Sequence, residues 1–149
     1  MPDKSSILNV LKLEIDERIS SLEKALENSR MEMANDTKST AGDKHETGRA
    51  MAQLEQEKLG KQVLAARELK QAVAQIDSSK SHSEIQFGSL VKASNGYFFF
   101  SVGIGKLIIE NETVFCLTMT SPLGIALRGK KVGDVIEFNG QKISILNVE

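Results

Sequence analysis

Three carboxylates near the middle of the chain have the type and spacing to hold a divalent cation. Asp43 and Glu46 stand three residues apart, and Asp36 lies nearby. Mg²⁺ takes oxygen ligands in near-octahedral geometry, which two carboxylates on an exposed loop cannot complete alone, so we expect no metal or cofactor in the free protein. The same Asp-x-x-Glu pair also matches a capping box, with Asp43 as the N-cap of a helix. Both interpretations stay open.

The other reactive residue types indicate no catalytic site. His45 and His82 share no ligand spacing, so they do not predict a metal centre. Cys116 is the single cysteine and has apolar neighbours, which predicts a buried thiol and excludes an intramolecular disulfide. No pairing of a nucleophile with a base is recognisable. We therefore predict that the protein is not an enzyme and has no active site of its own.

The chain divides into two halves of different composition near residue 86. All seven aromatic residues and eight of the eleven glycines follow that point, while the first half is rich in charge. We expect a helical hairpin over 1–78, a polar, serine-rich linker over 79–86, and a β-rich docking domain over 87–149. The formal net charge of −1 gives no basic field over the whole chain, so sequence-specific DNA binding is not expected.

The first half has the periodicity of two amphipathic helices. Residues 3–41 contain neither Gly nor Pro, and a second helical stretch runs from about 43 to 76, with a tip loop near 35–46 between them. Spacing of three and four residues predicts one buried stripe on each helix. The first stripe comprises Leu8, Leu11, Ile15, Ile19, Leu22, Leu26, Ser29 and Met33, and the second Leu59, Val63, Ala66, Leu69, Val73 and Ile76, with Met51 and Leu54 out of phase. We predict an antiparallel helical hairpin, or coiled coil.

The second half has the pattern of short strands and turns. Strands are expected at 87–93, 97–102, 106–110, 114–119, 135–138 and 141–148. The pairs Asn95-Gly96 and Asn139-Gly140 are typical of type I′ turns, and Ser121-Pro122 is typical of a helix start. The aromatic run 97–100 should supply the core on alternate positions. The fold class is therefore α+β, with a small antiparallel β domain that carries one short helix.

One ordered run in this half resembles a known family. The run is Ser121-Pro-Leu-Gly-Ile-Ala-Leu-Arg-Gly-Lys-Lys-Val-Gly-Asp-Val-Ile-Glu137, and it resembles the C-terminal signature of the bacterial Gre transcript-cleavage factors. The match is close over about 30 residues, and the helical half matches by architecture more than by residues. The resemblance implies an FKBP-like C-terminal domain that docks on bacterial RNA polymerase. It also implies a coiled coil that enters the secondary channel and modulates transcript cleavage or elongation.

The resemblance also implies roles for particular residues. Docking would involve Ser121, Pro122, Arg128, Lys130, Lys131 and Asp134. The tip carboxylates Asp43, Glu46 and Asp36 would assist the polymerase, sharing Mg²⁺ with it and meeting the nascent RNA only indirectly. The tip departs from the family, because the Gre acidic pair lies in a Leu-Ser-Glu-Asn context that residues 35–48 lack. This departure bears on cleavage more than on polymerase binding.

Two alternatives stay open. The first is a Gre-like inhibitor of RNA polymerase without cleavage stimulation. The second is an FKBP-like peptide-binding or prolyl-isomerase module, which requires an aromatic-lined pocket. No apolar run approaches the ~20 residues that span a bilayer, and the first residues, MPDKSS, lack a signal-peptide core, so no membrane partner and a cytoplasmic location are expected.

Overall fold

The computed structural model describes residues 2–36 and 42–149, without the side chains of residues 36 and 42–45. Its helical half consists of α1, Lys4–Asp36, and α2, Gly42–Ala74, each 33 residues long and therefore ~50 Å in length. α1 ends at Asp36 and α2 begins at Gly42, close to the expected start near residue 43, and residues 37–41 of the expected tip loop lie outside the described residues. A negative charge is favourable in the first turn of a helix, which is consistent with a helical start that includes Asp43 and Glu46.

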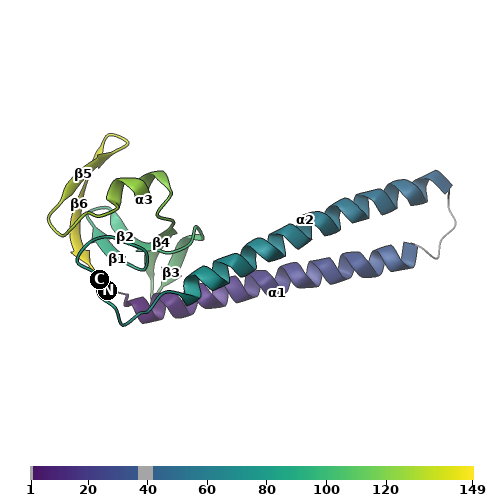
Figure 1. Ribbon diagram of the computed structural model, residues 1–149, viewed down its shortest axis with the longest axis horizontal. Helices are drawn as coiled ribbons and strands as arrows, with labels where there is room; N and C mark the ends of the chain where they lie inside the picture. The colour runs from purple at the N-terminus through teal and green to yellow at the C-terminus, as the bar shows by residue number, and fades with distance from the viewer. Residues whose placement is uncertain (1, 37–41) are drawn as a thin grey trace. The chain divides into compact units, whose positions relative to one another are not determined.

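The two helices lie side by side and antiparallel, as Figure 1 shows. Three contacts define the register: Lys70 with Asp16 at 2.9 Å, Arg67 with Glu23, and Gln56 with the sulfur of Met33 at 3.1 Å. As the residue number rises along α1, the partner's number falls along α2. The predicted helical hairpin is therefore confirmed.

The seam between the helices follows the predicted stripes. All eight predicted positions of α1 and all six of the second stripe are buried or half-buried. Met51 and Leu54 are 65% and 66% exposed, as expected for residues out of phase, and the seam continues instead through Ala52 and Gln56. Within residues 2–36 and 42–149, no helix combines the length and apolarity needed to cross a membrane.

The chain forms two compact units. One comprises Met1–Lys12 with Gln71–Glu149, and the other comprises Leu13–Lys70. The start of α1 and the end of α2 thus belong to the same unit as the sheet. The segment predicted as a linker, 79–86, is packed at its end, because Ile85 is buried and hydrogen-bonded to residues 129 and 130.

The second half of the chain forms a six-stranded sheet and one short helix. The strands are β1 Leu90–Ala93, β2 Gly96–Phe100, β3 Gly105–Ile109, β4 Glu112–Leu117, β5 Val135–Phe138 and β6 Gln141–Val148, and helix α3 spans Pro122–Leu127. Their order across the sheet is β3-β4-β2-β1-β6-β5. The predicted α+β class is confirmed.

The sheet is mixed, whereas an antiparallel sheet was expected. β2 pairs with β4 in parallel, and every other neighbouring pair is antiparallel. The reason is topological, because the β3–β4 hairpin places β4, not β3, against β2. The sequence pattern shows local hairpins but does not show which strand of a hairpin meets a distant neighbour.

The predicted turns are correct at one position and wrong at another. Asn139 and Gly140 have φ values of 51° and 77°, as a type I′ turn requires. In the first hairpin Gly96 pairs with Ala93, so the central turn residues are Ser94 and Asn95, and neither has a positive φ. The register follows the buried residues of the two strands and not the Asn-Gly pair.

Strand β2 is buried on both of its faces. Phe98, Phe99 and Phe100 are all buried, which corrects the expected alternation. Alternate side chains of a strand point to opposite faces, so both faces of this central strand must be covered. On the α3 side the buried cluster is Ile85, Val91, Ala93, Phe98, Phe100, Leu127, Ile143 and Ile145. Cys116 is buried as predicted, and burial raises the pKa of its thiol to about 12.

Candidate functional site

The run that suggested polymerase docking begins with a closed helix cap. The Ser121 Oγ accepts a hydrogen bond from the Gly124 amide at 3.0 Å and donates one to the Thr118 carbonyl at 2.8 Å. Pro122 occupies the first helical position, where a missing N–H has no effect on the helix. A Cβ on Gly124 would lie 2.1 Å from the Thr118 carbonyl oxygen, so only glycine fits there. Ser121, Pro122 and Gly124 thus have structural roles that require no partner.

The end of the run is a turn that closes on itself. The Lys131 amide donates to Asp134 Oδ2 at 2.8 Å, and the Asp134 amide donates to the Lys131 carbonyl at 3.0 Å. Gly129 has a φ of 75°, a conformation that favours glycine at the end of α3. Asp134 therefore maintains the turn, and its carboxylate is already used within the chain.

The run also contains three cationic residues, which are Arg128, Lys130 and Lys131. Lys131 Nζ lies 3.4 Å from Glu84, but both side chains are more than half exposed, so the pair contributes little stability. Arg128 is exposed, Lys130 is half-buried, and neither has an ion-pair partner among residues 2–36 and 42–149. Of the predicted docking residues, Arg128 and Lys130 are the ones with cationic groups available to a partner.

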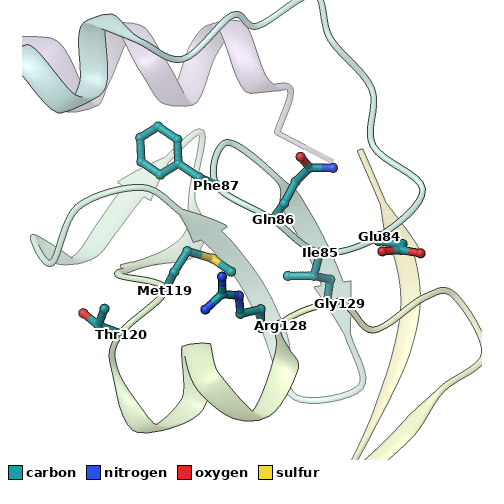
Figure 2. Close-up of a pocket in the computed structure, with 8 residues that line it drawn as sticks. All are labelled: Glu84, Ile85, Gln86, Phe87, Met119, Thr120, Arg128 and Gly129. Carbon is teal, nitrogen blue, oxygen red and sulfur yellow. The ribbon is translucent and has the colours of Figure 1, made fainter.

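Arg128 lines a groove of about 510 Å³, which Figure 2 shows. The groove is lined by Glu84, Ile85, Gln86, Phe87, Met119, Thr120, Arg128 and Gly129. The side chains of Met119 and Arg128 point toward one another, and the Phe87 ring lies apart from them. The site therefore combines an exposed aromatic ring, a thioether and a guanidinium.

Two backbone hydrogen bonds join the two sides of this groove. The Ile85 amide donates to the Lys130 carbonyl at 2.9 Å, and the Gly129 amide donates to the Ile85 carbonyl at 2.9 Å. The buried side chain of Ile85 belongs to the sheet core and holds residues 84–87 in place. Such a groove can accept an apolar side chain while Arg128 binds a carboxylate beside it.

The sequence alone did not indicate Phe87 or Met119 as site residues. Both stand at the ends of expected strands and have no motif of their own. Phe87 shares the groove with Arg128 because residues 84–87 return to the end of α3, which is a long-range contact, whereas Met119 lies just before that helix. Phe87 is 39% exposed, and this exposure is visible only in the structure.

Of the three predicted tip carboxylates, the structure describes the side chain of Glu46 alone. Asp36 ends α1 and Asp43 lies in the first turn of α2, but their side chains are outside the described part of the chain. Glu46 is exposed in α2, and residues three apart on a helix share a face. Among the described side chains, no group of three His, Cys, Asp or Glu residues is arranged to hold a metal ion.

Comparison with known proteins finds a likeness in structure but not in sequence. No family model and no curated protein matches the chain. Among solved structures the chain is similar to the transcription factor Gfh1, at 14% sequence identity and a TM-score of 0.41, covering 93% of this chain and 93% of that chain. At this score the likeness is one of coarse layout.

Proposed function

We propose that the chain is a transcription factor that binds bacterial RNA polymerase through the groove around Arg128. The observation that carries the proposal is that the run resembling the Gre signature, residues 121–137, contributes Arg128 and Gly129 to the lining of that groove. The capped helix of the run precedes Arg128, whose side chain points toward Met119, and Phe87 lines the same groove. Arg128 and the neighbouring Lys130 complement an acidic surface, while the ring and the thioether accept an apolar side chain.

The hairpin supplies the second part of the proposal. Its helices of 33 residues, ~50 Å long, are thin enough to enter a channel, and Asp43 and Glu46 lie within the first five residues of α2. Two carboxylates three residues apart offer oxygens to Mg²⁺ but leave its coordination incomplete, so the ion is shared with the polymerase. We propose that these carboxylates modulate transcript cleavage only in the complex with polymerase.

Docking is tested by charge reversal in the full chain. Arg128→Glu should weaken binding to core RNA polymerase by about tenfold or more, because it removes the cation and places a carboxylate against an acidic surface. The matched control is Lys142→Glu, which makes the same change of charge at an exposed position outside the groove. Fluorescence anisotropy with labelled protein measures both. Equal binding by the two variants would place the docking surface elsewhere.

The tip is tested in backtracked elongation complexes. The double variant Asp43→Asn with Glu46→Gln should lose stimulation of RNA cleavage and keep its affinity for polymerase, since amides preserve size but not charge. The control is Glu55→Gln with Glu57→Gln, two exposed carboxylates further along α2. Stimulation that survives the tip variant would leave Asp43 and Glu46 as helix-start residues. An unmodified protein that slows elongation without stimulating cleavage would favour the inhibitor.

A further inference from the structure

A second groove, of about 450 Å³, opens beside α3 and shares no residue with the groove around Arg128. It is lined by Asn95, Phe98, Phe115, Leu123, Phe138, Asn139, Gln141 and Ile143. These residues come from two strand turns, four strands and the helix, so the groove is assembled by the tertiary fold. Neither the docking nor the tip chemistry uses any of them.

The floor and walls of this aromatic groove are apolar. Phe98 and Ile143 are buried beneath it, at 5% and 2% exposure. The parallel pairing of β2 with β4 places Phe98 opposite Phe115, and their rings stack with centroids 5.9 Å apart. Phe115 nevertheless remains 41% exposed. A stacked ring with an open face is a preformed surface for another apolar side chain.

The rim of the aromatic groove consists of three carboxamides. All three are exposed: Asn95 and Asn139 lie in the β1–β2 and β5–β6 turns, and Gln141 is the first residue of β6. Each carboxamide offers both a donor and an acceptor, which matches the alternating N–H and C=O groups of a peptide backbone. None of the eight described lining residues is charged.

We infer that the aromatic groove binds an extended, uncharged segment of a partner protein. One aromatic or aliphatic side chain of that segment inserts beside Phe115, Leu123 and Phe138, and its backbone bonds to the carboxamide rim. A nucleic-acid strand would require cations along its phosphates, and the lining supplies none. An acyl chain would leave the carboxamides unpaired, which is unfavourable. The peptide backbone is the ligand that satisfies both the floor and the rim.

The inference is tested by NMR titration of the ¹⁵N-labelled full chain. The probe is a blocked hexapeptide, acetyl-Gly-Ala-Phe-Ala-Gly-Ser-amide, with a matched peptide that has serine in place of phenylalanine. The phenylalanine peptide should shift the side-chain amide signals of Asn95, Asn139 and Gln141, and the serine peptide should not. Hexauridylate serves as the nucleic-acid probe. Equal shifts with both peptides, no shifts, or shifts with hexauridylate alone would overturn the inference.

Variants locate the binding. Phe115→Ala should weaken the phenylalanine peptide about tenfold, and Gln141→Ala should weaken it by a smaller factor. Ile108→Ala is the control, because Ile108 is 65% exposed and does not line the groove. Unchanged affinity in both groove variants would overturn the assignment. The result is independent of polymerase binding: Phe115→Ala should keep its affinity for polymerase, and Arg128→Glu should keep its affinity for the peptide.

Discussion

The hairpin seam and the sheet core bury apolar side chains to different depths. In the core beside α3, Phe100 and Leu127 are completely buried within a cluster of eight residues. In the part of the hairpin from Leu13 to Lys70, a single stripe on each helix is covered, and Ile19, Leu22 and Leu26 stay half-exposed to solvent. A sheet with a helix against it can surround a side chain, whereas two helices can cover only one flank of it.

The seam also changes character along its length. Ile15, near the start of α1, is 1% exposed, while further along α1 the seam contains Ser29 and the contact of Met33 with Gln56. Apolar burial per residue therefore falls toward the tip. Local opening is easiest where few apolar contacts must be broken, so the hairpin should be most stable away from the tip. We therefore expect the sheet core to set the global stability of the chain and the stability of the seam to decrease toward the tip.

The largest effect is expected in the sheet core. Phe100→Ala removes a completely buried ring and should lower the free energy of unfolding by about 3–5 kcal/mol. Chemical denaturation followed by circular dichroism measures the loss. Ile108→Ala, at a position 65% exposed on the same sheet, should change it by about 0.5 kcal/mol or less. A loss at Phe100 as small as that at Ile108 would show that the buried core does not set the stability of the chain.

A smaller effect is expected in the middle of the seam. Leu22→Ala should lower stability by about 1 kcal/mol, because the side chain is only half-buried and lines a surface groove with Ala65 and Leu69. Hydrogen exchange should accelerate mainly for amides of residues 13–36 and 46–70, with the sheet amides unchanged. Uniform acceleration across both units would show that they unfold as one.

The hairpin was predictable from sequence because one local rule governs it. Steps of three and four residues named fourteen seam positions, and all fourteen are buried or half-buried. The sheet followed local rules only in part. Strand positions and the Asn139-Gly140 turn come from near neighbours, but the parallel pairing of β2 with β4 depends on residues far apart in the chain.

The two grooves also depend on contacts between residues far apart in the chain. The resemblance named Arg128 and Lys130 within one short run, yet Phe87 shares a groove with Arg128 only through the return of residues 84–87. The aromatic groove needs Phe98, Phe115 and Phe138 from three different strands. Sequence spacing cannot place such residues together, and alternation alone predicted a core role for the aromatic run but not the open face of Phe115.

A modest gain tests the gradient of the seam. Gln56→Leu replaces a half-buried carboxamide that donates to the sulfur of Met33, a weak acceptor. The added apolar contact should raise the free energy of unfolding by about 0.5 kcal/mol. Exchange should slow most for residues 50–60. Gln53→Leu, at an exposed position outside the seam, should give no gain. A loss of stability in the seam variant would mean that the polar contact itself supports the hairpin.

The smallest expected effect concerns pH and residues at the base of α1, in the unit that holds the sheet. His82 Nδ1 lies 2.8 Å from the Oγ of Ser89, whose residue is fully buried, and that same Oγ accepts the Gln86 amide. Lys4 donates to the Lys80 carbonyl at 2.6 Å. Burial first, then the positive charges of Lys4 and Lys80, lower the pKa of His82 below its ordinary value of 6.5. Burial also lowers the pKa of Lys4, while Glu149 and Asp77 oppose that shift.

The sign of the effect follows from the lowered pKa of His82. The unfolded chain takes up a proton on His82 more readily than the folded chain, so the His82 contribution to stability should fall as pH drops from ~7 to ~5. His82→Gln should remove that contribution and keep a side chain able to bond Ser89. Thermal unfolding should then show a Tm about 1–2 °C less sensitive to acid than the unmodified chain. His45→Gln, which replaces the other histidine, should retain the full sensitivity. If both variants respond to acid as the unmodified chain does, protonation of His82 does not strain this part of the β domain, and its contact with Ser89 tolerates either protonation state.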